Sequence, residues 1–530
     1  MANGELDLEW RPKFNPWLIA VVVAVAAFME VLDTSIANVA LPHIAGNLGA
    51  SMDQGTWVLT TYLVSNAIVL PISGWLTSVV GRKRFFLICI TLFTCASFCC
   101  GIAPSFGLLL LARVVQGAGG GGLQPMAQAI MADSFPPRLR GLAFAIFGIT
   151  VIVAPALGPT LGGWITDNYS WRWIFLINLP VGLIAVSLIS QLLEDPPFLR
   201  RVKAGEFRMD TIGLSMLVLG VGALQIMLDR GQEEDWFSSH FIVVLAIVAV
   251  VCLAFLVLWE WDDKGPTVDV RLFRHINFAG SCVIMFLAGI VSFSVSVLMP
   301  EFLQMFMGYT AQKAGLVVSA GAGIMLITIP LVGVLTSFVP AKYLIAFGWF
   351  GSALAMFWSA HVMSMQIDIG TAALVMVAQF VPVGFIFVPA ITASYIGVPQ
   401  DRSDSVSGLT NFMRNIGSGV GTSIVLTLIA RRSQFHLVRM SDHTGIGNTD
   451  FISQVQGLTY AIHMRSAGVG MADAQPGAMT QVYQFVAAQA LTLSYIDAYY
   501  LMGAASVVML FLSFFLKAND PKQTEQHATH

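Results

Sequence analysis

The sequence predicts an all-α membrane protein, in which fourteen transmembrane helices form two six-helix bundles with two further helices inserted between them. Three observations predict this fold: the composition, the apolar runs and an internal repeat. Of the 530 residues, 56% are hydrophobic and 11% are charged, and the mean hydropathy is +0.76. Soluble domains carry about 25% charged residues, because their surface needs polar cover. The composition therefore excludes a soluble protein of this length.

The charge balance and the absence of certain motifs narrow the function. The formal net charge of −3 shows no basic excess, so nucleic acid is not an expected partner. The sequence contains no GxxxxGK[ST] phosphate-binding loop, which argues against an ATP-driven pump. The six cysteines all lie in apolar runs and fit small hydrophobic side chains better than a metal site. We therefore expect no metal, no cofactor and no enzymatic activity.

Fourteen apolar runs give the order of the helices. Each span needs roughly 20 mainly apolar residues. No cleavage-site pattern follows the first run, so we expect it to remain as a helix and not to act as a cleaved signal. The predicted spans cover residues 16–41, 55–79, 85–103, 106–132, 141–165, 172–193, 210–228, 239–260, 277–300, 313–338, 342–362, 370–397, 405–430 and 494–516.

The distribution of basic residues sets the predicted orientation. An even number of spans puts both termini on one side of the membrane, and most of the 27 Lys and Arg residues fall in segments on that side. Basic loops favour the cytoplasm, so both termini are predicted to be cytoplasmic. One long segment lies on the other side, at 431–490, and its polar, mixed composition predicts a partly helical periplasmic hairpin.

A repeated pattern relates the two halves of the chain. Residues 74–83 and 333–342 share G-x-L-T-S-x-V-x-x-K, and each closes a predicted span. Spans 1–6 and 9–14 are therefore expected to be related bundles, as in transporters whose site lies near the midplane between two repeats. Spans 7 and 8 fall outside the repeat and are expected to pack beside the bundles. The predicted domains are an N-terminal bundle at 1–193, the inserted pair at 194–276, a C-terminal bundle with the hairpin at 277–516, and a cytoplasmic tail at 517–530.

Charged residues inside the spans are candidates for function, because a charge in the bilayer is costly. Glu30 and Asp33 share a helix face in the first span, as Arg113 and Gln116 do in the fourth. Burial favours a protonated carboxylate and a nearby guanidinium favours the ionised form, so a pair of Asp33, or Glu30, with Arg113 suits a proton-coupled carrier. We predict that Asp33 carries the proton, with Arg113 modulating it and Glu30 assisting. A fixed structural ion pair is the alternative for the pair, and a solvated end residue is the alternative for Glu30.

Polar residues in the second half are candidates for substrate binding. Arg414 fits three roles: binding an anionic substrate group, pairing with a carboxylate, or extending its charge to the inner interface. The repeat places Met376 where the first half has Arg113, so we expect proton chemistry in the first half and more substrate contacts in the second. The predicted substrate-binding residues are Gln116, Gln379, Asn411, Arg414 and Asn415.

Glycine and proline recur at regular spacing in the fifth span. Small residues four apart let another backbone approach closely, and prolines remove backbone donors and bend a helix. The pattern predicts a hinge or a sliding seal, with simple close packing as the alternative. The residues that form it are Gly148, Pro155, Gly158, Pro159, Gly162 and Gly163.

Together these motifs resemble the major facilitator superfamily. Residues 74–83 resemble its cytoplasmic loop motif, and residues 113–117 its fourth-helix motif. Residues 148–163 resemble the fifth-helix motif of its drug:proton antiporters, and residues 32–42 the first-helix motif of the fourteen-span branch. The resemblance covers nearly the whole chain and implies the major facilitator fold, with proton-driven export of hydrophobic toxic compounds from the inner membrane of a Gram-negative bacterium. It also implies a tripartite pump, with a periplasmic adaptor and an outer-membrane channel as partners.

The loop motif departs from the family pattern at two positions. Ser78 stands where the family usually has Asp, and Val79 where it usually has Arg. The charge network of this loop, which stabilises one conformational state in the family, is therefore expected to have fewer members here. Its role in stabilising that state stays open. The loop residues expected to take part in conformational change are Gly74, Gly81, Arg82 and Lys83.

Two other functions share some of these features. A proton-coupled nutrient importer would keep the fold and reverse the direction, and a receptor or assembly scaffold would not transport at all. The pattern at 155–163 favours export by its resemblance, and the paired charges of Asp33 and Arg113 favour a carrier over a scaffold. The hairpin at 431–490 has three open roles: docking an adaptor or handing substrate to it, covering the outer mouth of the pump, or remaining a solvated loop.

Overall fold

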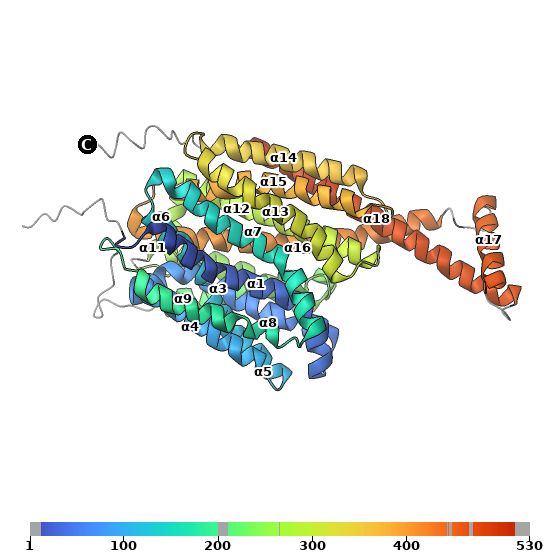
Figure 1. Cartoon of the computed structure of the whole chain (residues 1–530), viewed down its shortest axis with the longest axis horizontal. Coiled ribbons are helices and arrows are strands. Elements are labelled where there is room, and N and C mark those ends of the chain that lie inside the picture. The colour runs from blue at the N-terminus through green and yellow to red at the C-terminus, as the bar shows by residue number, and fades with distance from the viewer. Residues whose placement is uncertain are drawn as a thin grey trace, which may run out of the picture.

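All regular secondary structure in the described part of the chain is helical (Figure 1). The computed structural model describes residues 12–199, 210–263, 265–442, 444, 448–465 and 470–514. The predicted tail at 517–530 and the basic linker at 200–209 lie outside the described residues.

The helices match the predicted order of spans. Thirteen stretches among the described residues are long and apolar enough to cross a bilayer, and α12 adds the apolar stretch Ile276–Val291, consistent with fourteen spans. The first part of the chain forms α1 (Pro16–Leu48), α2 (Met52–Gly55), α3 (Trp57–Val80), α4 (Arg82–Gly101), α5 (Phe106–Gly120), α6 (Leu123–Ser134), α7 (Pro137–Asn168), α8 (Trp173–Leu176) and α9 (Asn178–Leu192). The inserted part forms α10 (Thr211–Arg230), η1 (Trp236–Ser238), α11 (His240–Asp262) and η2 (Val270–Arg274). The remainder forms α12 (Ile276–Met305), α13 (Ala311–Leu335), α14 (Ala341–Val362), α15 (Ile369–Ser394), η3 (Gln400–Arg402), α16 (Ser403–Ser441), α17 (Thr449–Arg465) and α18 (Met471–Ser513).

A run of glycines divides the predicted fourth span, 106–132, into α5 and α6. A Cβ on Gly119 would lie 2.7 Å from the backbone nitrogen of Phe93 in α4, and one on Gly121 would lie 2.6 Å from the carbonyl oxygen of Asn66 in α3. Larger side chains would push both neighbours away, so the glycines let three helices meet at backbone distance. The division sets Gln124 on the first turn of α6.

Gly81 joins α3 to α4 without a loop. Its φ of +93° lies in the region that favours glycine. Its N–H donates to the carbonyl of Thr77 at 2.8 Å, which closes the end of α3. The sharp turn makes Arg82 the first residue of α4 and leaves its side chain buried.

The two halves of the chain are in direct contact at the end of the bundle where Arg82 lies. Helix α13 packs against α7, and α16 packs against α3 and α6. A Cβ on Gly333 would lie 2.9 Å from the carbonyl oxygen of Gly141, and one on Gly74 would lie 2.8 Å from the Cα of Ser405. Glycines on both sides of the seam therefore bring the halves to backbone distance at this end.

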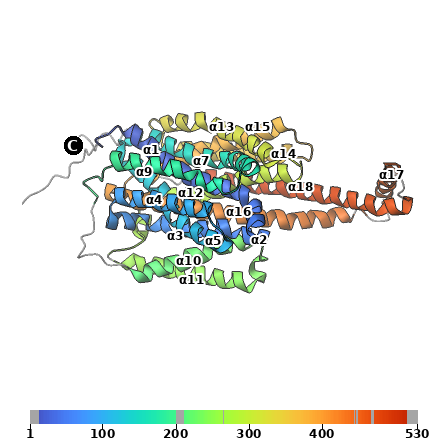
Figure 2. The same ribbon diagram turned by 60° about the horizontal axis from the view of Figure 1, so that its bottom comes forward.

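The inserted helices α10 and α11 lie side by side along one edge of the bundle (Figure 2). Helix α11 exposes a row of apolar side chains, with Val250 69% and Leu258 73% exposed, which suits contact with lipid. Helix α10 contacts both halves near its C-terminal end. Arg230 Nη1 donates to Thr56 Oγ1 at 2.7 Å, and Ser423 Oγ donates to the carbonyl of Leu228 at 2.5 Å.

Helices α16 and α18 extend well beyond the other helices, and α17 lies at the far end of this extension (Figure 1). We call the described part of residues 431–490 the arm. Helix α16 has 39 residues and α18 has 43. At 1.5 Å per residue each is about 60 Å long, roughly twice the thickness of the hydrocarbon core of a bilayer. The arm therefore projects from the membrane.

The arm differs from the predicted hairpin in how its helices begin and end. The sequence predicted spans that end at 430 and restart at 494, with a partly helical hairpin between them. Instead, both span helices continue into the arm, and α17 is the one separate helix among its described residues. Residues 430–441 contain neither glycine nor proline, so nothing ends α16 there. Helix α18 continues through Pro476, which lies near its start.

Candidate functional site

Asp33 of α1 and Arg113 of α5 form an ion pair inside the first half. Their side chains have no exposed surface, and Arg113 Nη1 lies 2.6 Å from Asp33 Oδ2. Taking both charges out of water is costly, so such a pair persists only where other hydrogen bonds complete it. Of the two carboxylates that the sequence offered to Arg113, Asp33 is the one paired with it and Glu30 is not.

Hydrogen bonds within the first half complete this pair. Asp33 Oδ1 accepts from Gln116 Nε2 at 3.0 Å and from Asn178 Nδ2 at 2.6 Å. Arg113 Nε donates to the carbonyl of Val58 at 3.0 Å, and its guanidinium lies 4.2 Å from the centre of the Tyr62 ring. Sequence reasoning missed Asn178, although an asparagine in an otherwise apolar span is itself a signal.

Glu30 lies one turn away on the same helix and is 4% exposed. The alternative that Glu30 is a solvated end residue is therefore wrong. Its carboxylate accepts from Tyr62 Oη at 3.1 Å, from Asn66 Nδ2 at 3.0 Å and from Gln124 Nε2 at 2.5 Å. Three donors from two helices hold it, and none of the three carries a charge.

Arg414 of α16 reaches toward Glu30 from the second half. Its Nη2 donates to Gln124 Oε1, and its guanidinium lies 5.4 Å from the centre of the Phe387 ring. The side chain thus points into the bundle and does not extend to the interface. Glu30, Gln124 and Arg414 form a chain that joins the two halves.

The structure separates the other predicted substrate residues. Asn411 Nδ2 donates to Gln128 Oε1 at 2.6 Å, which is a second amide contact between α16 and α6. Asn415 is half-buried on α16, one residue beyond Arg414. Gln379 donates to Ser359 Oγ at 2.8 Å within the second half, away from this group. Gln116 belongs to the Asp33 cluster.

Arg82 holds the two halves together through a buried charge network. Its Nη1 lies 2.7 Å from Asp133 Oδ2 in α6, and its Nε lies 2.8 Å from Asp404 Oδ1 in α16. Ser403 Oγ accepts from Arg82 at 3.1 Å and donates to Asp133 at 2.7 Å. The three charged side chains are at most 6% exposed. Sequence reasoning named Arg82 but missed both aspartates, because each lies near a span end, where solvated carboxylates are common.

The neighbouring loop residues stay within the first half. Ser78 Oγ donates to the carbonyl of Trp75 in its own helix at 2.8 Å. Lys83 Nζ donates to the carbonyl of Ser190 at 2.7 Å, and Lys83 N donates to Asp195 Oδ1 at 2.7 Å. In this region Arg82 therefore carries the charged contact between the halves.

The glycine and proline face of α7 packs on α1. A Cβ on Gly162 would lie 3.1 Å from Ile36 Cγ2, and a Cβ on Gly158 would overlap Ser35. Pro159 lacks the N–H that would bond the carbonyl of Pro155. Ser35 Oγ donates to that carbonyl at 2.8 Å instead. The proline therefore leaves a backbone acceptor in α7 free, and a side chain of α1 bonds to it.

Gly148 and Gly163 have different surroundings from Gly158. A Cβ on Gly148 would make ordinary contacts with Ile329 in α13 and Val388 in α15, at 3.4 and 3.6 Å. A Cβ on Gly163 would meet no atom within 4 Å. The predicted face of α7 therefore contacts α1 at Gly158 and Gly162, and the second half at Gly148.

We expect Gly158→Leu to abolish transport, because the added side chain has no space against Ser35 and would force α7 away from α1. Gly163→Leu on the same helix should leave transport near the wild-type rate. The measurement is uptake of a labelled hydrophobic cation into proteoliposomes, with size-exclusion profiles to check assembly. Equal loss in both variants would contradict the packing argument.

The fold and this site define a class of protein: a helical membrane transporter whose two halves meet around buried charged groups. The chain belongs to the Major Facilitator Superfamily, whose family model matches residues 23–422.

Relatives within this family are similar over nearly the whole chain. The chain is 38% identical over 501 residues to the multidrug export protein EmrB of Escherichia coli (strain K12), which covers 94% of this chain and 95% of that protein. It is 38% identical over 426 residues to the fatty acid resistance protein FarB of Neisseria gonorrhoeae, which covers 80% of this chain and 83% of that protein. The solved structure of the proton:xylose symporter XylE with 6-bromo-6-deoxy-D-glucose matches with a TM-score of 0.58 at 13% identity, over 96% of this chain and 97% of that one. This last similarity shows the fold alone.

Proposed function

We propose that this protein is a proton-coupled multidrug exporter, which exchanges hydrophobic toxic compounds for protons. One observation carries the proposal: two carboxylates are buried on α1, one paired with Arg113 and the other linked to the second half. Intramembrane carboxylates of this kind mark proton relays in transporters. The 38% identity to a multidrug export protein supports drug efflux as the direction and the substrate range.

In this proposal Asp33 carries the exchanged proton, Arg113 modulates it and Glu30 assists. Protonation of Asp33 removes the charge that holds Arg113, so α1 and α5 are held less tightly. Because Ser35 and Ile36 of the same helix pack on the glycines of α7, a shift of α1 moves the wall of the first half. Proton affinity and helix position are linked in this way.

Substrate contacts in this proposal come from α16, where Asn411, Arg414 and Asn415 lie on the part of the helix nearest α6. Gln116 and Gln379 are weaker candidates, because each amide is occupied within its own half. The Arg82 network closes one end of the seam, so it opens when that end admits substrate.

The proposed location is the inner membrane of a bacterium, with both termini in the cytoplasm. The basic residues near Gly81 support this orientation, which puts the Arg82 network at the cytoplasmic end and the arm in the periplasm. A periplasmic adaptor and an outer-membrane channel are the proposed partners, and the arm is the part of the chain that extends toward them.

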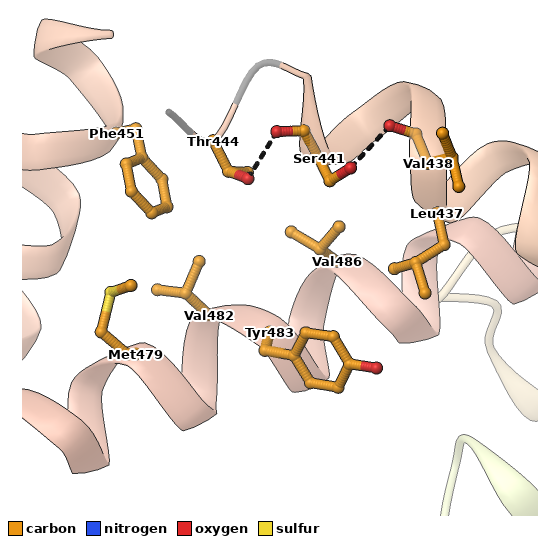
Figure 3. Close-up of a pocket in the computed structure, with 9 residues that line it drawn as sticks. All are labelled: Leu437, Val438, Ser441, Thr444, Phe451, Met479, Val482, Tyr483 and Val486. Atoms are coloured by element: carbon orange, nitrogen blue, oxygen red, sulfur yellow. Dashed lines mark hydrogen bonds between the residues drawn. The ribbon is translucent and has the colours of Figure 1, made fainter. Parts of the chain in front are cut away.

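The arm carries an apolar cavity of about 360 Å³, in which side chains from α16, α17 and α18 gather (Figure 3). Apolar side chains in and beside the cavity are exposed, including Tyr483 at 62% and Phe485 at 63%. An exposed apolar surface outside the membrane favours contact with another protein over a solvated loop. The cavity is lined by Leu437, Val438, Ser441, Thr444, Phe451, Met479, Val482, Tyr483 and Val486.

We expect replacement of residues 440–480 by a short Gly/Ser linker to separate two activities. Efflux in proteoliposomes should survive, because the arm lies outside the bundle that holds the charged groups. Co-purification of the adaptor and resistance of whole cells should fall. A matched control replaces only Tyr483 and Phe485 by serine, which removes apolar surface without shortening the arm. Adaptor binding that persists undiminished in both variants would exclude the arm as the main contact.

Counterflow of a labelled hydrophobic cation in proteoliposomes, with and without a pH gradient, tests the function. An exporter exchanges the cation for protons, so an imposed gradient accelerates its movement against the direction of proton flow. A nutrient importer would move its substrate with the protons, and a scaffold would give no counterflow at all.

A further inference from the structure

The amide of Gln124 joins an acid of the first half to a base of the second. Its Nε2 donates to Glu30 Oε2 at 2.5 Å, and its Oε1 accepts from Arg414 Nη2. The three residues come from α1, α6 and α16. Because α6 and α16 lie on opposite sides of the seam, the chain of hydrogen bonds breaks when the halves separate at this level.

Arg414 is half-buried and differs in its partners from the buried arginines of the described residues. Arg82, Arg113 and Arg230 each contact a carboxylate directly. In the described part of the chain, Arg414 forms no ion pair with a carboxylate. A charge with little access to water and no direct counter-ion is costly, and the hydrogen bond to Gln124 and the contact with the Phe387 ring both compensate it.

The orientation of the Gln124 amide group depends on the ionisation state of Glu30. An ionised carboxylate only accepts hydrogen bonds and a guanidinium only donates them, so the amide offers its NH₂ to one and its carbonyl to the other. A protonated Glu30 has a donor of its own and a weaker need for the amide NH₂. Loss of the charge therefore weakens the hydrogen bond to Gln124 and, through it, the contact with Arg414.

The other groups around Glu30 do not interrupt its connection through Gln124 to Arg414. Tyr62 and Asn66 of α3 donate to it and are neutral. Asp33 on α1 is paired with Arg113, and Gln124 of α6 lies between Glu30 and the Arg414 side chain of α16. Tyr62 also contacts the Arg113 guanidinium through its ring, so the two carboxylate sites adjoin at this side chain.

We infer that Gln124 is a positioning residue that transmits the protonation state of Glu30 to Arg414, and so ties proton binding on α1 to the position of α16. The inference rests on the proposed function and deepens it, because it names the residue through which the second half responds to the proton. The sequence marks Gln124 only as an amide in an apolar span, and its partners lie on two distant helices.

Gln128 provides a matched control on the same helix. It lies one turn beyond Gln124, and its Oε1 accepts from Asn411 Nδ2 on α16 at 2.6 Å. Both amides thus contact α16 across the seam, but the contact of Gln128 includes no charged group. Gln124→Met and Gln128→Met remove the same amide with little change in side-chain length.

The experiment measures gradient-driven transport of tetraphenylphosphonium in proteoliposomes as a function of pH, for Arg414→Gln in three backgrounds. In the wild-type background, loss of the cation should move the midpoint of the pH profile to higher pH by about one unit, because the ionised form of Glu30 loses its support. The same shift should appear with Gln128→Met and should be clearly smaller with Gln124→Met, where the hydrogen-bonded connection is broken and only the Coulomb attraction between Arg414 and Glu30 remains.

Two results would overturn the inference: an undiminished Arg414→Gln shift in the Gln124→Met background, or the same pH profile for both methionine variants. If Gln124→Met does not assemble, Gln124→Leu replaces it, and the pH dependence of substrate binding to purified protein gives the same comparison without transport. Absence of gradient-driven transport in the wild type would instead count against the proposed function, so the two failures are distinguishable.

Discussion

Asp33→Asn is expected to reduce gradient-driven transport to the level of empty liposomes, while the protein still assembles in the membrane. The substitution keeps the shape of the side chain but removes the group that binds the proton. It also leaves Arg113 buried without its counter-ion, which costs about 3 to 5 kcal/mol. We therefore expect a lower thermal transition in detergent together with the loss of coupling.

A double variant separates these two effects. Asp33→Asn with Arg113→Gln removes both charges, so no unpaired charge remains at the site and much of the lost stability should return. Transport should stay absent, because neither side chain then exchanges a proton. Recovery of gradient-driven transport in the double variant would show that the pair is structural only, which is the alternative reading of this motif.

Arg82→Gln is expected to have the second largest effect. The substitution leaves Asp133 and Asp404 buried beside each other without the cation between them. Breaking such a network removes about 3 to 5 kcal/mol from the state in which the halves are closed at this end. The population should shift toward the state open at this end, and efflux should fall with it. Labelling of a cysteine placed near the seam, measured with and without the substitution, detects the opening.

Lys83→Gln is the matched control for this prediction. Lys83 is the adjacent basic residue, but it is half-buried and its side chain donates to the carbonyl of Ser190 within the first half. We expect near-normal efflux and no change in labelling. If Lys83→Gln opens the seam as much as Arg82→Gln does, the contact between the halves is not carried by Arg82.

The sequence predicted the first part of the site because charges in apolar spans are rare. Asp33 and Arg113 each interrupt a run of hydrophobic residues at a spacing that sets one helix face, and the structure pairs them at 2.6 Å. Family membership and the order of spans followed from motifs and composition in the same way. These signals are local, so one sequence is enough to detect them.

The residues that sequence reasoning missed act through long-range contacts. Gln124, Asn178, Asp133 and Asp404 each gain their role from a partner on a different helix. Gln124 and Asn178 are amides in apolar spans and the two aspartates lie near span ends, but no spacing rule brings α6 and α16 together. The helix ends in the arm were mispredicted for a related reason: apolar length defines where a span ends, but a helix continues until glycine, proline or a lost contact ends it.

Proton release on substrate binding tests the central claim most directly. Purified protein in weakly buffered detergent solution is mixed with a hydrophobic cation that it binds, and a pH indicator reports the protons. An antiporter, in which proton and substrate exchange on the same protein, predicts release in the wild type and none in Asp33→Asn with Glu30→Gln. Proton uptake, or binding with no proton movement in the wild type, would contradict the account.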